Sequence, residues 1–194
     1  MSAVTEPERI YFFVGRPGSG KETQSRLLAE KLGFPIFTTG GRFREIIASG
    51  SYLGERIKRI YEEGLLMPAW VANYMFEEFV FNLPPEKGAI FEGSGRDLEQ
   101  AKVIDEVCAW LGRPYVVLNL EVSEEEVLHR SVLRARDKTD TAAVVGTRLE
   151  EYKRLTEPAI EYFRLIGKCV DIDGSAAVEA VHKEVVRAVS ALPA

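Results

Sequence analysis

The sequence predicts a three-layer α/β fold, in which helices cover both faces of a parallel β-sheet. Short apolar runs alternate with segments of helical periodicity, a pattern typical of βαβ units. A glycine-rich turn follows the first apolar run directly and opens a helix. The chain has 194 residues, 46% of them hydrophobic, which is enough for one domain with a sizeable core. Ligands of such sheets bind at the carboxyl ends of the strands.

The first strand and helix are predicted on either side of that turn. Ile10–Val14 is a continuous apolar run, as expected of a buried strand. Gly20–Leu32 has helical periodicity and places Leu27, Leu28 and Leu32 on its inner face.

A second short strand, Pro35–Thr38, leads into a helical region. Three helical stretches follow, with breaks at Gly50–Ser51 and at Gly64–Pro68. The last stretch ends at about Leu83, because Pro84-Pro85 cannot continue a helix.

The middle of the chain repeats the strand and helix alternation. Ala89–Glu92 is the third predicted strand, Asp97–Leu111 a helix, and Tyr115–Val122 the clearest strand in the sequence. Ser123 and Glu126 have the spacing of a capping box, which predicts the start of another helix.

The last third completes the predicted sheet. Asp140–Leu165 is mostly helical in pattern, Cys169–Ile172 is the fifth strand, and Ser175–Leu192 is a closing amphipathic helix.

Composition excludes several classes of function. The net charge is −5 and no Lys/Arg tract is present, which disfavours a nucleic-acid surface. No apolar run reaches the length of a membrane span, and the first residues, MSAVTEPE, lack the features of a signal peptide. Cys108 and Cys169 are far apart without a CxxC motif, which disfavours structural zinc and a disulfide framework. A cytoplasmic location is therefore expected.

The strongest functional signal is the turn GRPGSGKET at residues 15–23. In such a loop, backbone N–H groups surround a phosphate, and only glycines permit that path. The helix that follows adds its N-terminal donors, and Lys21 can reach the β- and γ-phosphates. The predicted ATP-binding residues here are Gly15, Pro17, Gly18, Ser19, Gly20, Lys21, Glu22 and Thr23.

Glu22 departs from the general pattern, which has Ser or Thr after the lysine to bind magnesium. Three interpretations stay open. Glu22 ligates Mg²⁺ itself, turns outward and pairs with Arg26 at i+4, or weakens ATP binding by repelling the γ-phosphate.

The chain resembles the adenylate kinase family of nucleoside monophosphate kinases. GRPGSGKETQ is similar to the family loop G-x-P-G-x-G-K-G-T-Q, and the resemblance continues in order along nearly the whole chain. The further matching segments are Thr39–Arg44 (T-G-D-x-x-R), Gly64–Pro68 (G-x-L-V-P), Glu92–Gln100 (D-G-F-P-R-x-x-x-Q), Arg130, Arg134 and Arg136 beside the ATP lid, Asp140 with Arg148, Leu149 and Tyr152 (D-(x)7-R-L-x-x-Y), and Asp173-Gly174.

The resemblance implies a five-stranded parallel sheet in the order 2-3-1-4-5 and one domain over residues 1–194. Helices at about 39–83 would form the monophosphate-binding part, and a short lid without zinc would span about 134–140. The implied reaction is MgATP + AMP ⇌ 2 ADP by direct in-line transfer, catalysed by a monomer with Mg²⁺ as cofactor.

The resemblance also assigns roles to single residues. Lys21, Arg96, Arg134, Arg136 and Arg148 would be catalytic, and Arg130 and Arg134 would bind ATP. Glu92 would hold Mg²⁺ through water, unless it is only a capping or solvated acid. The implied AMP-binding residues are Thr39, Gly40, Arg44, Met67, Gly93, Arg96, Gln100, Arg136 and Arg148.

Two of these residues have an equally simple local explanation. Gln100 would contact the adenine edge, but Asp97 and Gln100 also have capping-box spacing. Thr39 is either a base contact or a helix N-cap.

Other departures cluster at the monophosphate site. Gly41 and Ala69 replace family aspartates. Ser94-Gly95 replaces Phe-Pro, so Arg96 is expected to be less preorganised. A kinase for UMP, CMP or dAMP and a non-catalytic nucleotide-binding protein stay open as alternatives. A switch GTPase is disfavoured, because no N-K-x-D segment is present.

Overall fold

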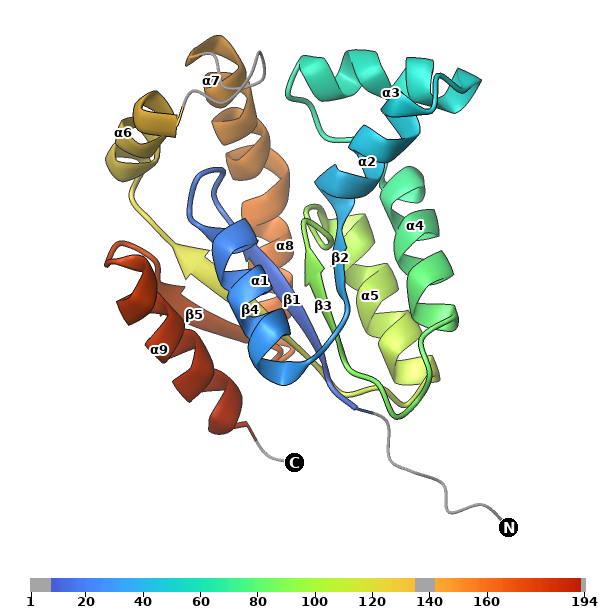
Figure 1. Cartoon of the computed structure of the whole chain (residues 1–194), viewed down its shortest axis with the longest axis vertical. Coiled ribbons are helices and arrows are strands. Elements are labelled where there is room, and N and C mark those ends of the chain that lie inside the picture. The colour runs from blue at the N-terminus through green and yellow to red at the C-terminus, as the bar shows by residue number, and fades with distance from the viewer. Residues whose placement is uncertain (1–7, 135–141, 193–194) are drawn as a thin grey trace.

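The computed structural model describes residues 8–134 and 142–192, and its middle layer is a five-stranded parallel sheet (Figure 1). The strand order is β2-β3-β1-β4-β5, which confirms the predicted fold class. Every neighbouring pair is parallel, so the carboxyl ends of the strands meet at one edge. The strands are β1 (Ile10–Gly15), β2 (Ile36–Thr38), β3 (Ala89–Glu92), β4 (Tyr115–Glu121) and β5 (Cys169–Asp173).

The described helices begin and end within a few residues of the predicted bounds. One element was not predicted, a five-residue π-helix between α7 and α8. The helices are α1 (Lys21–Leu32), α2 (Thr39–Ala48), α3 (Tyr52–Glu62), α4 (Ala69–Phe81), α5 (Leu98–Trp110), α6 (Glu124–Arg134), α7 (Ala142–Glu151), the π-helix η2 (Tyr152–Thr156), α8 (Glu157–Leu165) and α9 (Val178–Ser190).

Alternate residues of the buried strands belong to two separate cores. On one face, Phe12 and Phe91 pack with α4, α5 and α8. On the other, Phe13 and Leu118 pack with α1 and α9. The two-residue period of a strand causes this division and explains why the strands are apolar throughout.

The inner face of α1 differs in one position from the predicted face. Leu28 is buried, and Leu32 packs at the margin of the core. Leu27 is only half-buried, whereas Ala29 is 7% exposed. The face that α1 turns inward is therefore shifted by one residue toward Gln24, Ser25 and Ala29.

Both predicted helix starts form, but neither makes the second bond of a full capping box. The Asp97 carboxylate accepts the Gln100 N–H at 2.8 Å, whereas the Gln100 side chain accepts from the N–H of Arg96, the residue before the N-cap. Ser123 accepts the Glu126 N–H at 3.2 Å, while the Glu126 carboxylate pairs with Arg130 instead.

Helices α2, α3 and α4 form a small core of their own above the sheet. Phe43, Ile57, Met67, Val71 and Met75 are its buried members. This cluster gives the region predicted to bind the monophosphate an internal core, so the three helices can hold side chains at fixed positions beside the strand ends.

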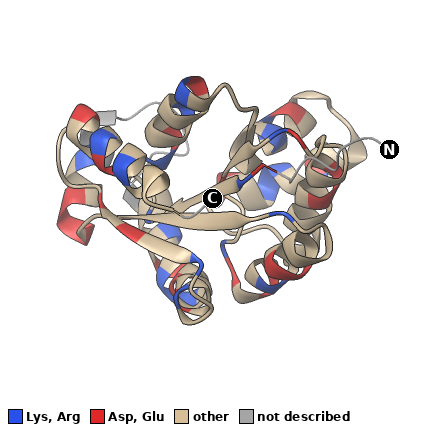
Figure 2. Cartoon of the chain, turned by 90° about the horizontal axis from the view of Figure 1, so that it is seen from below, with Lys and Arg blue, Asp and Glu red and all other residues tan. Residues whose placement is uncertain are grey.

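Charges of both signs are mixed over the helices in the view from below (Figure 2). That view faces the end of the molecule opposite the carboxyl ends of the strands. Within residues 8–134 and 142–192, no helix is both long and apolar enough to cross a membrane.

We expect Phe91→Ala to lower the free energy of unfolding by about 3–5 kcal/mol, because Phe91 is fully buried. Its ring centroid lies 5.0 Å from that of Phe12 and 5.3 Å from that of Phe76. Urea denaturation measures the loss. The control Phe81→Ala, at a ring 54% exposed, should cost less than about 1.5 kcal/mol. Equal losses in the two variants would contradict this account of the core.

Candidate active site

A cavity lies at the carboxyl ends of β1 and β3, between the glycine-rich loop, α2, the α3–α4 connection and the α7–η2 segment. Elements far apart in the sequence therefore meet where a parallel sheet is expected to bind its ligand. The cavity is lined by Pro17, Gly18, Gly20, Lys21, Glu22, Thr39, Gly40, Phe43, Arg44, Tyr61, Gly64, Leu65, Leu66, Met67, Glu92, Gly93, Arg96, Arg148, Glu151, Tyr152 and Thr156.

The glycine-rich loop has a backbone that only glycine adopts readily. Gly15, Gly18 and Gly20 have φ values of 133°, 79° and 94°. A Cβ at Gly15 would lie 2.4 Å from the Leu120 carbonyl oxygen, so a larger residue would push β1 away from β4. The loop ends at the N-terminus of α1, where N–H groups without helical partners favour an anion.

Lys21 begins α1 and is 8% exposed. Its ammonium donates to the carbonyl oxygens of Gly15 at 2.9 Å and Arg16 at 2.7 Å. The lysine therefore crosses the inside of the loop and keeps its charge at the rim of the cavity, where a polyphosphate would bind.

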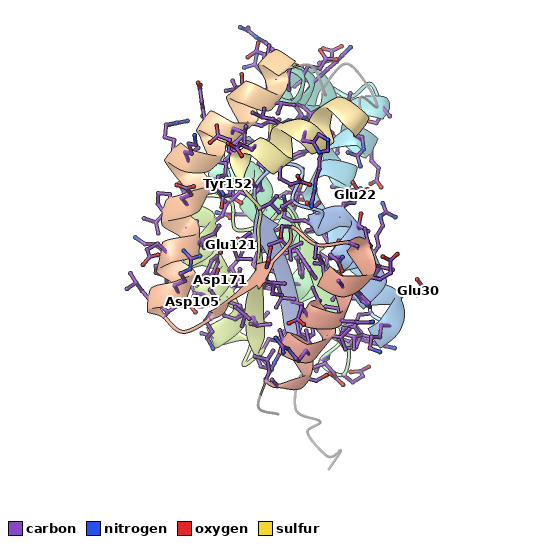
Figure 3. All side chains as sticks on the ribbon, turned by 90° about the vertical axis from the view of Figure 1, so that its left-hand side faces the viewer. Glu22, Glu30, Asp105, Glu121, Tyr152 and Asp171 are labelled. Atoms are coloured by element: carbon purple, nitrogen blue, oxygen red, sulfur yellow. The ribbon has the colours of Figure 1, made fainter. Side chains whose placement is uncertain are left out.

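Glu22 pairs with Arg26 at 3.2 Å, as the second interpretation predicted, and it also lines the cavity. The two side chains are 53% and 63% exposed. Figure 3 shows Glu22 at the N-terminal end of α1. Because an exposed i,i+4 pair is weak, Arg26 keeps the Glu22 carboxylate outward only loosely.

The acceptor side of the cavity is built on α2. Thr39 is its first residue, so the N-cap position belongs to Thr38 and the N-cap interpretation of Thr39 is wrong. The Thr39 hydroxyl lies 3.2 Å from the Ser94 hydroxyl, which ties α2 to the turn after β3. Arg44 is on the next turn of α2 and donates to the Tyr61 hydroxyl at 3.0 Å.

Arg96 is more firmly held than the sequence suggested. Its N–H donates to the Gln100 side chain at 3.1 Å, and its carbonyl oxygen accepts from the Thr156 hydroxyl at 2.8 Å. Both backbone groups are thus bonded, and they restrain the residue although Ser94-Gly95 lacks the rigidity of Phe-Pro.

Arg148 reaches the cavity from α7, on the side opposite α2. This helix lies close to the α3–α4 connection. A Cβ at Gly64 would lie only 2.9 Å from the Val144 side chain. The Leu66 N–H also donates to the Glu151 carboxylate at 3.3 Å. These contacts close one side of the cavity.

Electrostatics of the cavity favour a multiply charged anion. Burial lowers the pKa of Arg96, and the neighbouring Arg148 lowers it further, whereas Glu92 and Glu151 act to raise it. The hydrogen bond that Arg44 donates to the Tyr61 hydroxyl raises the pKa of Arg44. Arginines stay charged at neutral pH, so an anionic ligand would relieve the repulsion that Glu92 and Glu151 leave uncompensated.

Glu92 ends β3 and lines the cavity near Lys21 and Arg96. The residues present fit Mg²⁺, since this ion prefers oxygen ligands and keeps several waters when substrate phosphates supply the rest. Within residues 8–134 and 142–192, no group of three His, Cys, Asp or Glu side chains forms a metal cage. A single carboxylate acting through water is consistent with that arrangement.

Several predicted site residues do not line the cavity. Gln100 is 3% exposed, and its amide bonds the Arg96 N–H and the Asp97 carboxylate, so the capping interpretation accounts for it. Arg130 donates to Glu126 and to the carbonyl oxygens of Gly174 and Ser175. Gly15 and Ser19 shape the loop from beneath, and Thr23 is exposed on α1.

Part of the predicted ATP side lies outside the described residues. Arg136 and Asp140 belong to that segment, as does the predicted lid except for Arg134. Arg134 is the last residue of α6, and its side chain is outside the described part.

Three residues of the cavity lie outside the segments singled out from the sequence. Tyr61 lines the α2–α3 side, and Glu151 and Thr156 line the α7–η2 side. The only sequence signal for Tyr61 is its place in the last turn of a helix just before a predicted break at Gly64. Thr156 bonds a carbonyl 60 positions away, a contact that no local pattern contains.

Known proteins resemble this chain over most of its length. The adenylate kinase family model matches residues 13–168. The chain is 38% identical to the adenylate kinase of Mycolicibacterium smegmatis over 180 residues, covering 92% of this chain and 96% of that protein. It is 36% identical to adenylate kinase 1 of Synechocystis sp. over 170 residues, covering 87% and 90%.

A third relative extends the likeness. The adenylate kinase of Archaeoglobus fulgidus is 33% identical over 204 aligned positions, covering 89% of this chain and 94% of that protein. A glycine-rich loop with a buried lysine, three arginines in one cavity and relatives aligned over most of their length all lead to one assignment: the chain belongs to the adenylate kinase family.

Proposed function

We propose that this protein catalyses MgATP + AMP ⇌ 2 ADP by direct in-line phosphoryl transfer. The observation that carries the proposal is one cavity into which Lys21 comes from one side, Arg44 and Arg96 from another and Arg148 from a third. Phosphoryl transfer needs positioning and charge stabilisation more than a nucleophilic side chain, and this cavity supplies both.

The donor half of the site is the glycine-rich loop. Its backbone N–H groups and the α1 N-terminus would hold the β-phosphate, and Lys21 would exchange its carbonyl partners for phosphate oxygens. Glu92 would hold Mg²⁺ through water. The bound ion would neutralise charge on the β- and γ-phosphates.

The acceptor half lies between α2 and the turn after β3. Arg44 and Arg96 would bind the monophosphate, and Arg148 would reach across to the transferred group. Thr39, Gly40, Met67 and Gly93 line the remaining wall. Two arginine forks on one phosphate fix its orientation as well as its position, and the attacking oxygen needs that orientation.

Exclusion of water would come from the approach of α7 to the α3–α4 connection. The Leu66 to Glu151 hydrogen bond and the contact of Gly64 with Val144 already join the two sides. A closed site of this kind favours transfer to the monophosphate over transfer to water.

A second candidate is a kinase for another nucleoside monophosphate. The observation that favours it is the Gln100 amide, which is engaged in the cap of α5 and does not face the acceptor. The assay that separates the candidates measures ADP formation from MgATP with AMP, UMP, CMP, GMP or no acceptor. Fastest turnover with AMP supports the adenylate kinase proposal, whereas preference for another acceptor supports the second candidate.

We expect Arg96→Ala to lower kcat/KM for AMP by roughly a hundredfold or more, because it removes a half-buried cation that would bind the phosphate. The measurement is the initial rate of ADP formation at varied AMP. Arg59→Ala is the matched control, since the Arg59 side chain is 85% exposed and pairs with Glu63 at the C-cap of α3. An active Arg96→Ala enzyme would contradict the assigned role.

We expect Glu22→Gln to leave the Mg²⁺ concentration for half-maximal rate within about twofold of the unmodified protein, because the loss of an exposed pair costs less than about 1 kcal/mol. Glu30→Gln, an exposed change on the same helix, is the control. A large shift confined to Glu22→Gln would instead make this carboxylate a magnesium ligand.

A further inference from the structure

Tyr61 lines the cavity from the last turn of α3, yet the reaction described above gives it no role. Its ring packs edge-on against Phe43, with centroids 6.5 Å apart and planes at 73°. Phe43 is 7% exposed and belongs to the small core of α2, α3 and α4. The phenol is therefore held by a buried neighbour and does not move freely on the surface.

The Tyr61 hydroxyl lies among the acceptor-side cations. Its oxygen accepts from the Arg44 guanidinium at 3.0 Å. Tyr61, Arg44 and Arg96 line the same cavity. Gly41 has no side chain that could contact Arg44. A Cβ at that position would lie 3.9 Å from a guanidinium nitrogen of Arg44. Tyr61 supplies that contact.

The hydrogen-bonding capacity of Tyr61 is only partly used. A phenol has one O–H donor besides its acceptor lone pairs, and Arg44 occupies the acceptor side. In the part of the chain that the structure describes, no acceptor is bonded to that O–H. Beside Arg44, Arg96 and Arg148, the complementary partner for a free donor is an anionic oxygen.

We infer that Tyr61 is a ligand of the acceptor phosphate. Its hydroxyl donates to a phosphate oxygen of the nucleoside monophosphate while its own oxygen holds the Arg44 guanidinium toward the same group. The inference rests on the proposed function, because it concerns the acceptor subsite of that reaction.

Tyr61→Phe tests the inference, since it keeps the ring against Phe43 and removes only the hydroxyl. We expect KM for AMP to rise roughly tenfold, with KM for ATP and kcat within about twofold. Tyr52→Phe, on the same helix with a side chain 78% exposed, should change none of these values. An unchanged KM for AMP, or an equal rise for AMP and ATP, would overturn the inference.

Calorimetric titration separates a phosphate contact from a contact with the base. Tyr61→Phe should weaken AMP binding by a similar factor and leave adenosine binding unchanged, because adenosine has no phosphate. Equal weakening of both ligands would overturn the phosphate contact. The titration needs no turnover, so an inactive protein would count against the proposed reaction and leave this test intact.

A double variant separates direct contact from positioning through Arg44. If Tyr61 donates to the phosphate itself, Tyr61→Phe still weakens AMP binding when Arg44 is replaced by Gln. If the effect disappears in that background, Tyr61 acts only by positioning Arg44 and the direct contact is refuted.

Discussion

The close approach of Gly15 to the Leu120 carbonyl oxygen is the constraint on which the rest of the site depends. It lets β1 and β4 stay paired up to the last residue of β1 while the chain turns into the phosphate-binding loop. Gly174 makes a second close approach, since a Cβ there would lie 3.2 Å from the Ser19 carbonyl oxygen. Lys21 then bonds the loop carbonyls from inside. The loop is therefore shaped by backbone contacts with the sheet, and α1 begins where that shape places it.

The π-helix η2 connects the glycine-rich loop with the part of the cavity that contains Arg96. Tyr152 opens η2, and the Arg16 guanidinium lies over its ring at 5.3 Å. Thr156 closes η2 and bonds the Arg96 carbonyl oxygen. Figure 3 shows Tyr152 on the α7–α8 side of the sheet, away from α1 and Glu22. One five-residue element thus contacts both the glycine-rich loop and Arg96. These two contacts give a physical reason for the extra residue of a π-turn at η2. π-Bulges often occur at functional sites.

Sequence patterns predicted the helices and strands well, because strand runs, helix periodicity and turns depend on neighbouring residues. Every predicted strand is present within a few residues of its predicted bounds. The order of the strands came from family resemblance instead. The bond from Thr156 to the Arg96 carbonyl oxygen was missed because the two residues are distant in the sequence. Gln100 had two consistent interpretations, and only the position of its amide favours the cap.

The charge balance gives a reason why arginine rather than lysine lines the side of the cavity proposed to bind the acceptor. The protein carries a net charge of −5, so the cations that attract phosphate must be concentrated in one cavity. Placing the arginines together in a cavity disfavours their charged forms, since burial and the neighbouring Arg148 both lower the pKa of Arg96. A lysine in that position starts from a lower pKa and loses its charge more readily when buried. Glu92 and Glu151 offset part of the repulsion without filling the cavity. Arginine therefore keeps its charge under conditions that would neutralise a lysine, and its planar fork is matched to phosphate oxygens.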